Sequence, residues 1–194
     1  MLISGLLLVC ARASAADRQI RPFVGATFGG GTTFVDPEDA AGKLKPAIGA
    51  SAVFLGEVFG AEIDIADAPG FFESGDKHLV LYSRVTTISG NVVVAAPHRL
   101  TEYSLRPYFV GGAGLMRVRR TTASSVFDIS RVMPALDAGV GVVAFLTNRV
   151  GVSWDVRRFQ SVGSNTSSVG LSFGESGEEH LSFWRAAMAV VVRY

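Results

Sequence analysis

Along most of this chain, bulky apolar residues alternate with small or charged residues, and this is the period of a β-strand rather than of a helix. The alternation is clearest near the carboxyl end, where Trp184, Met188 and Val190 share one face while Arg185 and Ala187 share the other. The pattern predicts eight strands. They span residues 21–29, 46–55, 58–66, 79–95, 105–119, 132–146, 150–161 and 181–194.

The connections between these segments alternate in length. Residues 56–57 and 147–149 are short and residues 96–104 are intermediate, whereas the others, 30–45, 67–78, 120–131 and 162–180, are long. Transmembrane β-barrels have such an alternation, with long external loops and short periplasmic turns. The sequence therefore predicts an all-β fold, an eight-stranded antiparallel up-and-down transmembrane β-barrel over residues 21–194, with both ends of the chain on the periplasmic side.

The sizes of the side chains indicate which face meets lipid. In the last segment one face carries Trp184 and Met188, whereas the other mixes alanines with Arg185 and Arg193. Eight strands leave an interior that side chains can fill, and a Lys or Arg on the lipid face at mid-depth costs about 2–4 kcal/mol. We therefore expect bulky apolar residues to face lipid and charges to lie in the lumen. A soluble periplasmic lipid-binding barrel, with the opposite polarity, is an alternative.

Charged residues of both signs fall on the predicted inner faces in similar number. Such a mixture favours an internal ion-pair network that closes the lumen over a ring of one sign that selects ions. Arg119 and Arg193 belong to the same set but lie near strand ends, where water can reach them. The residues predicted to form the network are Glu62, Asp64, Arg117, Asp137, Asp155, Arg157 and Arg185.

Aromatic residues cluster near the predicted strand ends. Membrane barrels have two girdles of aromatic residues, one on each side of the apolar band. We therefore expect these residues to face the membrane interfaces. They are Phe23, Phe28, Phe54, Phe59, Tyr82, Tyr108, Phe145, Trp154, Trp184 and Tyr194.

The first residues have the features of a cleaved export signal. The apolar run 2–9 is too short to cross a bilayer as a helix, and Ala13 and Ala15 provide the small residues that a signal peptidase requires. Cleavage is expected after Ala15, so that residues 1–15 are the signal peptide and residues 16–20 a short segment before the barrel. Cys10 leaves with the signal. Lipid attachment at Cys10 is the alternative, which the bulky residue before it disfavours.

Charge and composition narrow the classes of partner. The net charge is +1 and charged residues make up 18% of the chain, so the sequence lacks the basic surplus that binds nucleic acid. After the signal there is no run of 18 apolar residues that predicts a transmembrane helix. The stretch 29–31 is rich in glycine, but neither Lys-Ser/Thr nor a helix follows it, so it is not a phosphate loop. We expect no cofactor, no nucleic-acid partner and a monomer.

Candidate catalytic and metal-binding residues are few. His180 and Ser182 have the spacing of a base and a nucleophile, but no Asp or Glu follows Ser182 to orient the histidine. His78 and His98 are expected at opposite ends of the barrel, which disfavours a shared metal site. The acidic stretch 36–39 lacks the spacing of a calcium loop. We therefore expect neither catalysis nor a bound metal.

Several segments resemble one family. RPFVG at 21–25, RPYFVGGAG at 106–114 and DAGVGV at 137–142 resemble the strand starts of the OmpA/OmpX-like outer-membrane β-barrel superfamily. Residues 146–157 resemble the turn and strand that come seventh in that family, and residues 184–194 resemble its terminal strand with a final aromatic residue. The resemblance implies an insertion signal for the outer-membrane assembly machinery, formed by Val190, Val192 and Tyr194.

The resemblance predicts architecture better than function, since members of the superfamily include structural, adhesive, protective and small-pore proteins. We expect a non-enzymatic outer-membrane protein with a filled lumen and a structural or surface-interaction role. A narrow pore for small solutes is the first alternative. The expected partners are the barrel assembly machinery, outer-membrane lipid and lipopolysaccharide. Three arginines that lead into an external loop are candidates for contacts with lipopolysaccharide phosphates: Arg117, Arg119 and Arg120.

Overall fold

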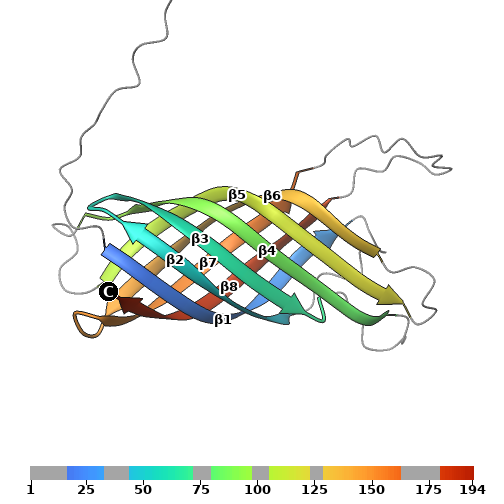
Figure 1. Ribbon diagram of the computed structural model, residues 1–194, viewed down its shortest axis with the longest axis horizontal. Coiled ribbons are helices and arrows are strands. Elements are labelled where there is room, and N and C mark those ends of the chain that lie inside the picture. Colours follow the sequence, from blue (N-terminus) through green and yellow to red (C-terminus); the bar gives the residue numbers. More distant parts are fainter. Residues whose placement is uncertain (1–16, 33–43, 72–79, 98–104, 123–128, 163–179) are drawn as a thin grey trace, which may run out of the picture.

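The computed structural model describes residues 17–32, 44–71, 80–97, 105–122, 129–162 and 180–194 of the 194-residue chain. These residues form a closed barrel of eight strands, and each strand pairs antiparallel with its neighbours (Figure 1). The strands are β1 (Asp17–Thr32), β2 (Lys45–Leu55), β3 (Phe59–Pro69), β4 (Val80–Ala95), β5 (Leu105–Thr122), β6 (Ile129–Phe145), β7 (Val150–Ser161) and β8 (Leu181–Arg193).

The start of β1 and the end of β8 lie at the end of the barrel that also carries the short turns. β1 pairs with both β2 and β8, so the barrel has no open edge. The Tyr194 amide donates a hydrogen bond to the Arg18 carbonyl (3.1 Å), and in the β2–β3 turn the Gly56 amide donates to the Phe59 carbonyl (2.8 Å). Short turns are periplasmic in membrane barrels. We therefore name this the periplasmic end and the opposite one the outer end.

All eight predicted strands are confirmed, and the differences lie at their ends. β1 begins at Asp17 rather than at residue 21, β6 begins at Ile129 rather than at residue 132, and β5 continues to Thr122. The added residues at these ends are mostly polar, so the contrast between apolar and polar neighbours that predicts a strand is weak there. The backbone goes on pairing there, because the neighbouring strand still offers hydrogen-bond partners.

Some of the sequence-based predictions concern residues outside the described ranges. The cleavage site at Ala13 and Ala15 is one of them. The others are His78, His98 and the acidic stretch 36–39. These remain predictions.

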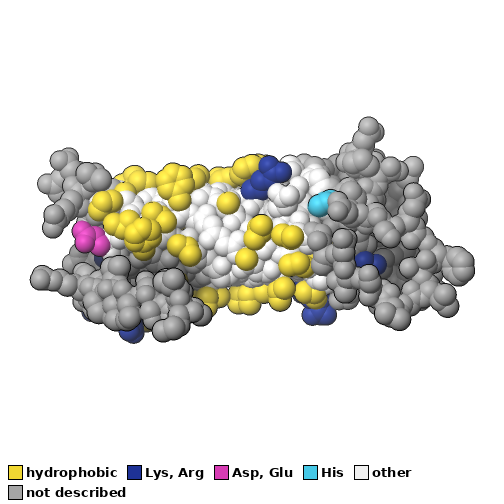
Figure 2. Space-filling view, turned by 90° about the horizontal axis from the view of Figure 1, so that it is seen from above, with side chains coloured by type: hydrophobic (Ala, Val, Ile, Leu, Met, Phe, Trp, Pro, Cys, Tyr) yellow, Lys and Arg dark blue, Asp and Glu magenta, His cyan; other side chains and the backbone are white. Residues whose placement is uncertain are grey.

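Large apolar side chains cover the outer wall of the barrel. Ile63, Val140 and Met188 are each about half exposed, and each alternates along its strand with inward-facing neighbours. Figure 2 shows hydrophobic side chains gathered along the wall, with few charged side chains among them. Such a wall suits hydrocarbon, and the soluble alternative requires the opposite polarity. The described part of the chain contains no helix long and apolar enough to cross a bilayer.

The lumen contains more bulky apolar side chains than we expected from the sequence, which suggested glycine, alanine and charges. They form two large clusters, and a smaller third cluster of Phe23, Ala66, Ala187 and Ala189 lies beside the charged residues. The outer apolar cluster consists of Ala47, Ala68, Phe71, Val85, Met116, Val118, Met133, Ala135, Phe159, Leu181 and Phe183. The periplasmic apolar cluster consists of Val53, Leu55, Val93, Ala95, Tyr108, Val110, Val143 and Val191.

Two glycines make room for aromatic rings inside the barrel. Gly49 is the cross-strand partner of Phe23, and Gly141 is the partner of Tyr108. A Cβ atom at either glycine would collide with the ring of its partner. Because the glycine has no side chain, each ring can fold over bare backbone into the lumen.

β1 carries a bulge near its outer end. The register with β8 shifts between Phe28 and Gly31, and Gly29 within this stretch has a φ of 59°. Residues with side chains seldom adopt this left-handed conformation, whereas glycine does so without strain. The glycine-rich stretch 29–31 therefore allows β1 to form this bulge.

Candidate functional site: the charged lumen

Charged side chains on the inward positions of the strands occupy the lumen. Because side chains alternate between the two faces of a strand, a charge whose neighbours face lipid must point into the barrel. Among the described residues the buried acids number four, as do the buried bases, so their formal charges cancel. A neutral lumen does not select ions of one sign. The residues are Glu62, Asp64, Asp137, Asp155, Arg21, Arg106, Arg157 and Arg185.

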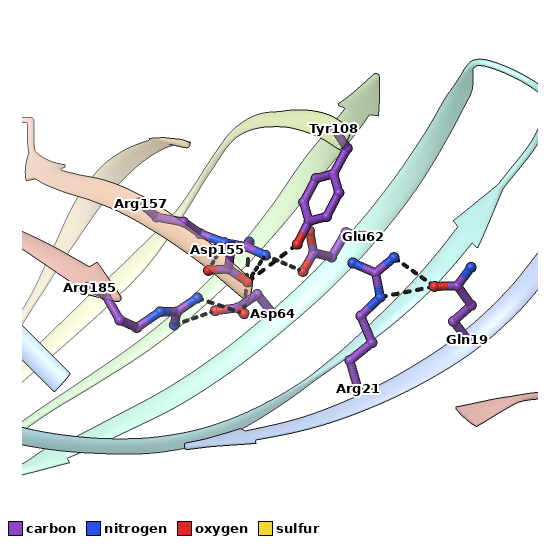
Figure 3. A network of polar contacts seen from close by, with 8 residues as sticks. All are labelled: Gln19, Arg21, Glu62, Asp64, Tyr108, Asp155, Arg157 and Arg185. Carbon is purple, nitrogen blue, oxygen red and sulfur yellow. Dashed lines mark hydrogen bonds and ion pairs between the residues drawn. The ribbon is translucent and has the colours of Figure 1, made fainter. Parts of the chain in front are cut away.

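Arg157 of β7 lies at the centre of an ion-pair network (Figure 3). Its Nη2 donates a hydrogen bond to Glu62 Oε1 at 2.9 Å, and its Nε donates to Asp155 Oδ1 at 3.0 Å. Its Nη1 lies 3.9 Å from Asp64 Oδ2. β3 and β7 are four strands apart in a ring of eight, so the contact between Arg157 and Glu62 crosses the full width of the lumen.

Arg185 of β8 forms the second crossing of the lumen. Its Nη1 and Nη2 donate to the two carboxylate oxygens of Asp64 at 2.9 and 3.0 Å, which is the bidentate geometry of a strong charged hydrogen bond. The guanidinium carbon lies 4.5 Å from the centre of the Phe23 ring and 4.9 Å from that of Phe159. Arg185 therefore connects the charged network to the outer apolar cluster, to which Phe159 belongs.

Sequence reasoning missed the part of the lumen around Arg21. Arg21 Nε and Nη2 donate to Gln19 Oε1 at 3.0 and 2.6 Å, and its guanidinium carbon lies 5.1 Å from the centre of the Tyr108 ring. The Tyr108 hydroxyl contacts Asp155 Oδ2 at 3.4 Å, which is a weak hydrogen bond at most. The first segment carries small or apolar groups on both faces, so its pattern did not indicate which face is inward.

Arg106 is a further lumen residue that the sequence did not indicate. It is buried near the periplasmic end, where its Nε donates to the Ala96 carbonyl at 2.9 Å. Its Nη2 donates to the carbonyls of Glu57 at 2.6 Å and Gly56 at 3.2 Å. Arg106 thus joins two periplasmic connections that are far apart in sequence. The sequence feature that could have pointed to Arg106 was its position beside Pro107, at the start of the segment RPYFVGGAG.

Two arginines that we expected in the lumen lie on the outer wall. Arg117 and Arg119 are exposed, because Met116 and Val118 take the inward positions of β5. The prediction was wrong for a physical reason: near its outer end β5 extends beyond the hydrocarbon, and there an outward charge has no lipid penalty. The fifth segment also carries small residues on both faces, which left its orientation open.

Two further predicted residues lie inside the barrel but outside the network. Asp137 is buried and faces the lumen, yet it forms no hydrogen bond or ion pair with another described residue. Arg193 lies near the periplasmic end, where its Nε is 2.7 Å from Asp17 Oδ1 and its guanidinium carbon is 3.8 Å from the centre of the Phe145 ring. The central network of the described residues is therefore smaller than the predicted one.

The predicted aromatic girdles divide between wall and lumen. Phe54, Phe59, Trp154, Trp184 and Tyr194 are exposed on the wall, and Phe28 is half-buried. The prediction was wrong for three residues, which point inward because glycine partners or cluster packing accommodate their rings. The side chain of Tyr82 is outside the described part. The three inward residues are Phe23, Tyr108 and Phe145.

The order of inward residues along a strand locates the charged network. Along β4 the inward side chains run from Val85 through Thr87, Ser89 and Asn91 to Val93. The two valines belong to the outer and the periplasmic apolar clusters, respectively. Polar side chains therefore lie between two apolar layers. The lumen has three layers, of which the charged one is central.

Other candidate chemistry remains without a built site in the described residues. No group of three or more His, Cys, Asp and Glu side chains among them is placed to hold a metal. Ser182 is on the outward face of β8, and His180 is exposed just before that strand.

Val190, Val192 and Tyr194 are exposed on the outer wall. Their recognition by the assembly machinery stays a prediction.

The closed barrel, its apolar wall and its filled lumen define a transmembrane β-barrel of the bacterial outer-membrane class. No protein-family model matches the chain, and no curated protein is similar to it in sequence. Solved structures with the same fold include Neisserial surface protein A (NspA), with a TM-score of 0.64 at 12% identity, covering 91% of this chain and 97% of that one.

Two structures from Pseudomonas aeruginosa have the same architecture. The outer membrane protein OprG has a TM-score of 0.59 at 9% identity, covering 93% of this chain and 96% of that one. The N-terminal β-barrel domain of OprF has a TM-score of 0.57 at 11% identity, covering 92% and 97%. The chain has the fold of the OmpA/OmpX-like outer-membrane barrels. With its lipid-facing wall, this fold places the protein in the bacterial outer membrane.

Proposed function

We propose that this protein is a non-enzymatic outer-membrane barrel that conducts no solute and has a structural or surface-interaction role. The observation that carries the proposal is the three-layered filling of the lumen. The contact between Arg157 and Glu62 crosses the barrel at 2.9 Å, with an apolar cluster on each side of the charged layer. A path for solutes would have to break all three layers.

The absence of enzymatic activity is part of the proposal. Ser182 lies on the outward face of β8 rather than in a pocket with a base and an orienting acid, as a nucleophile requires. Five of the charged residues in the lumen are paired with one another: Glu62, Asp64, Asp155, Arg157 and Arg185. These placements favour a structural role for the charges.

Planar-bilayer recording tests the proposal. Folded protein, extracted in detergent and checked by its heat-modifiable migration in gels, is expected to give no discrete current steps. Reproducible current steps from the wild-type barrel would contradict the proposal and favour the narrow pore.

A matched pair of double variants tests whether the lumen is closed by the network. E62A/R157A removes the crossing contact, whereas I63A/V156A changes the neighbouring residues of the same strands that face lipid. We expect ion leak to rise in E62A/R157A alone. Equal leak in both variants would indicate that general loosening of the barrel, rather than the network, controls the path.

A further inference from the structure

Three arginines project from the outer wall of β4 and β5 close to the outer end. Arg84 and Arg119 are direct cross-strand partners, and Arg117 lies two residues from Arg119 on the same face. Directly opposed residues of antiparallel strands have Cβ atoms about 4.5–5.5 Å apart. Three guanidinium groups are therefore presented to one part of the membrane. We call Arg84, Arg117 and Arg119 the arginine patch.

On β4 and β5 the arginine patch lies where the apolar wall ends, whereas Val132 of β6, the cross-strand partner of Arg117, is still an exposed apolar residue. The preceding outward pair toward the periplasmic end is Ile88 and Leu115, which are cross-strand partners and about half exposed. The next outward pair is Thr86 and Arg117, so the wall changes from apolar to polar in register on both strands. One such step is about 6.8 Å along a strand, or roughly 5 Å of depth at a tilt of about 40°. The patch therefore lies at the depth of lipid headgroups.

Asp67 of β3 contacts the patch from the adjacent strand. Its Oδ2 lies 3.3 Å from Arg84 Nε, and its Oδ1 accepts a hydrogen bond from the Thr86 hydroxyl at 2.9 Å. Three arginines and one aspartate carry a formal charge of +2. Like charges directly opposite each other destabilise a sheet, so a phosphate bound beside Arg84 and Arg119 reduces the repulsion between these two cross-strand partners.

We propose that the arginine patch binds the phosphate groups of lipid A, the membrane anchor of lipopolysaccharide in the outer leaflet. A guanidinium forms bidentate hydrogen bonds with a phosphate, and neighbouring guanidinium groups match a lipid that carries two phosphates. The patch is at the outer end of the wall, so the leaflet it meets is the external one. The proposal is independent of whether the lumen conducts.

Native mass spectrometry of the folded barrel in detergent tests the proposal, with bisphosphorylated lipid A as the probe. A charge-assisted hydrogen bond contributes about 1.5–3 kcal/mol, so we expect R117Q/R119Q to raise the apparent Kd for lipid A by about tenfold or more. Fully dephosphorylated lipid A should bind wild type and variant alike. The wild type and R117Q/R119Q are first checked for folding by heat-modifiable migration.

R18Q/R149Q is the matched control, because it removes the same charge from exposed residues at the periplasmic end. Its apparent Kd should equal that of the wild type. The proposal is overturned if R117Q/R119Q binds lipid A as tightly as the wild type, or if R18Q/R149Q loses as much. It is also overturned if phosphatidylglycerol binds the wild type as tightly as lipid A, since the patch would then recognise phospholipid.

Discussion

Ile63 and Asp64 are neighbours in β3, yet they lie in opposite environments. Ile63 is 55% exposed on the wall, whereas Asp64 is completely buried and accepts two hydrogen bonds from Arg185. On the wall, any apolar side chain of suitable size meets the requirement of lipid. In the lumen, each side chain depends on particular partners. Loss of a partner should therefore have a larger effect in the lumen than an apolar exchange on the wall.

The largest loss of unfolding free energy is expected for a variant at the centre of the network. Arg157→Ala leaves Glu62 and Asp155 as buried acids without their main partner, and removal of one member of a buried ion pair costs about 3–5 kcal/mol. Urea unfolding in lipid vesicles measures the loss, and both tryptophans, Trp154 and Trp184, are on the wall as fluorescent probes. The double variant E62A/R157A should lose less than the sum of its single variants. A loss below about 1 kcal/mol in R157A would contradict the role of the network.

The next largest loss of unfolding free energy is expected when a charged residue replaces an apolar residue on the wall. Ile63→Arg places a charge against hydrocarbon, which costs about 2–4 kcal/mol near mid-depth. Ile63→Leu is the control and should cost less than about 1.5 kcal/mol, because it keeps size and polarity. The same unfolding assay compares the two. Equal stability of Ile63→Arg and Ile63→Leu would show that this face does not meet lipid.

Two methionines allow the same substitution to be compared in the lumen and on the wall. Met116 is fully buried in the lumen, whereas Met188 is 51% exposed on the wall. Met116→Ala should cost about 2–5 kcal/mol, because it leaves a cavity among packed side chains. Met188→Ala should cost about 1–2 kcal/mol, because lipid fills the space and only apolar transfer is lost. Equal losses in the unfolding assay would mean that the lumen is loosely packed.

The smallest change in unfolding free energy is expected when the ion pair on the wall is removed. Arg84 and Asp67 are partly exposed, with side-chain exposures of 41% and 26%. Exposed pairs contribute about 0–1 kcal/mol, so Arg84→Gln should change the unfolding free energy by no more than this. A loss as large as that of Arg157→Ala would remove the distinction between the wall and the lumen.

The fold could be predicted from the sequence because lipid and lumen impose opposite requirements on alternate residues. In β7 and β8 this contrast is strong, since Trp154 and Met188 alternate with Asp155 and Arg185. In β1 and β5 it is weak. Phe23 and Tyr108 point inward, which depends on a glycine in the next strand. Such pairing depends on register, and a single segment does not contain that information.

The charged site could be predicted in part for the same reason. Glu62, Asp64, Asp155 and Arg157 lie on strands with clear alternation, and the structure brings them together. Arg117 was assigned to the lumen by a rule that keeps charges out of lipid. The rule does not apply where a strand rises above the hydrocarbon.

The lumen contacts join parts of the chain that are synthesised far apart. Arg157 and Glu62 are separated by 95 residues, and Arg185 and Asp64 by 121. Such distant contacts form late and slowly in folding. A sheet that has not yet curled round to join β1 to β8 holds β3 and β7 apart, so these bonds are a signature of completed closure. Their appearance during refolding would therefore time the final step of barrel assembly.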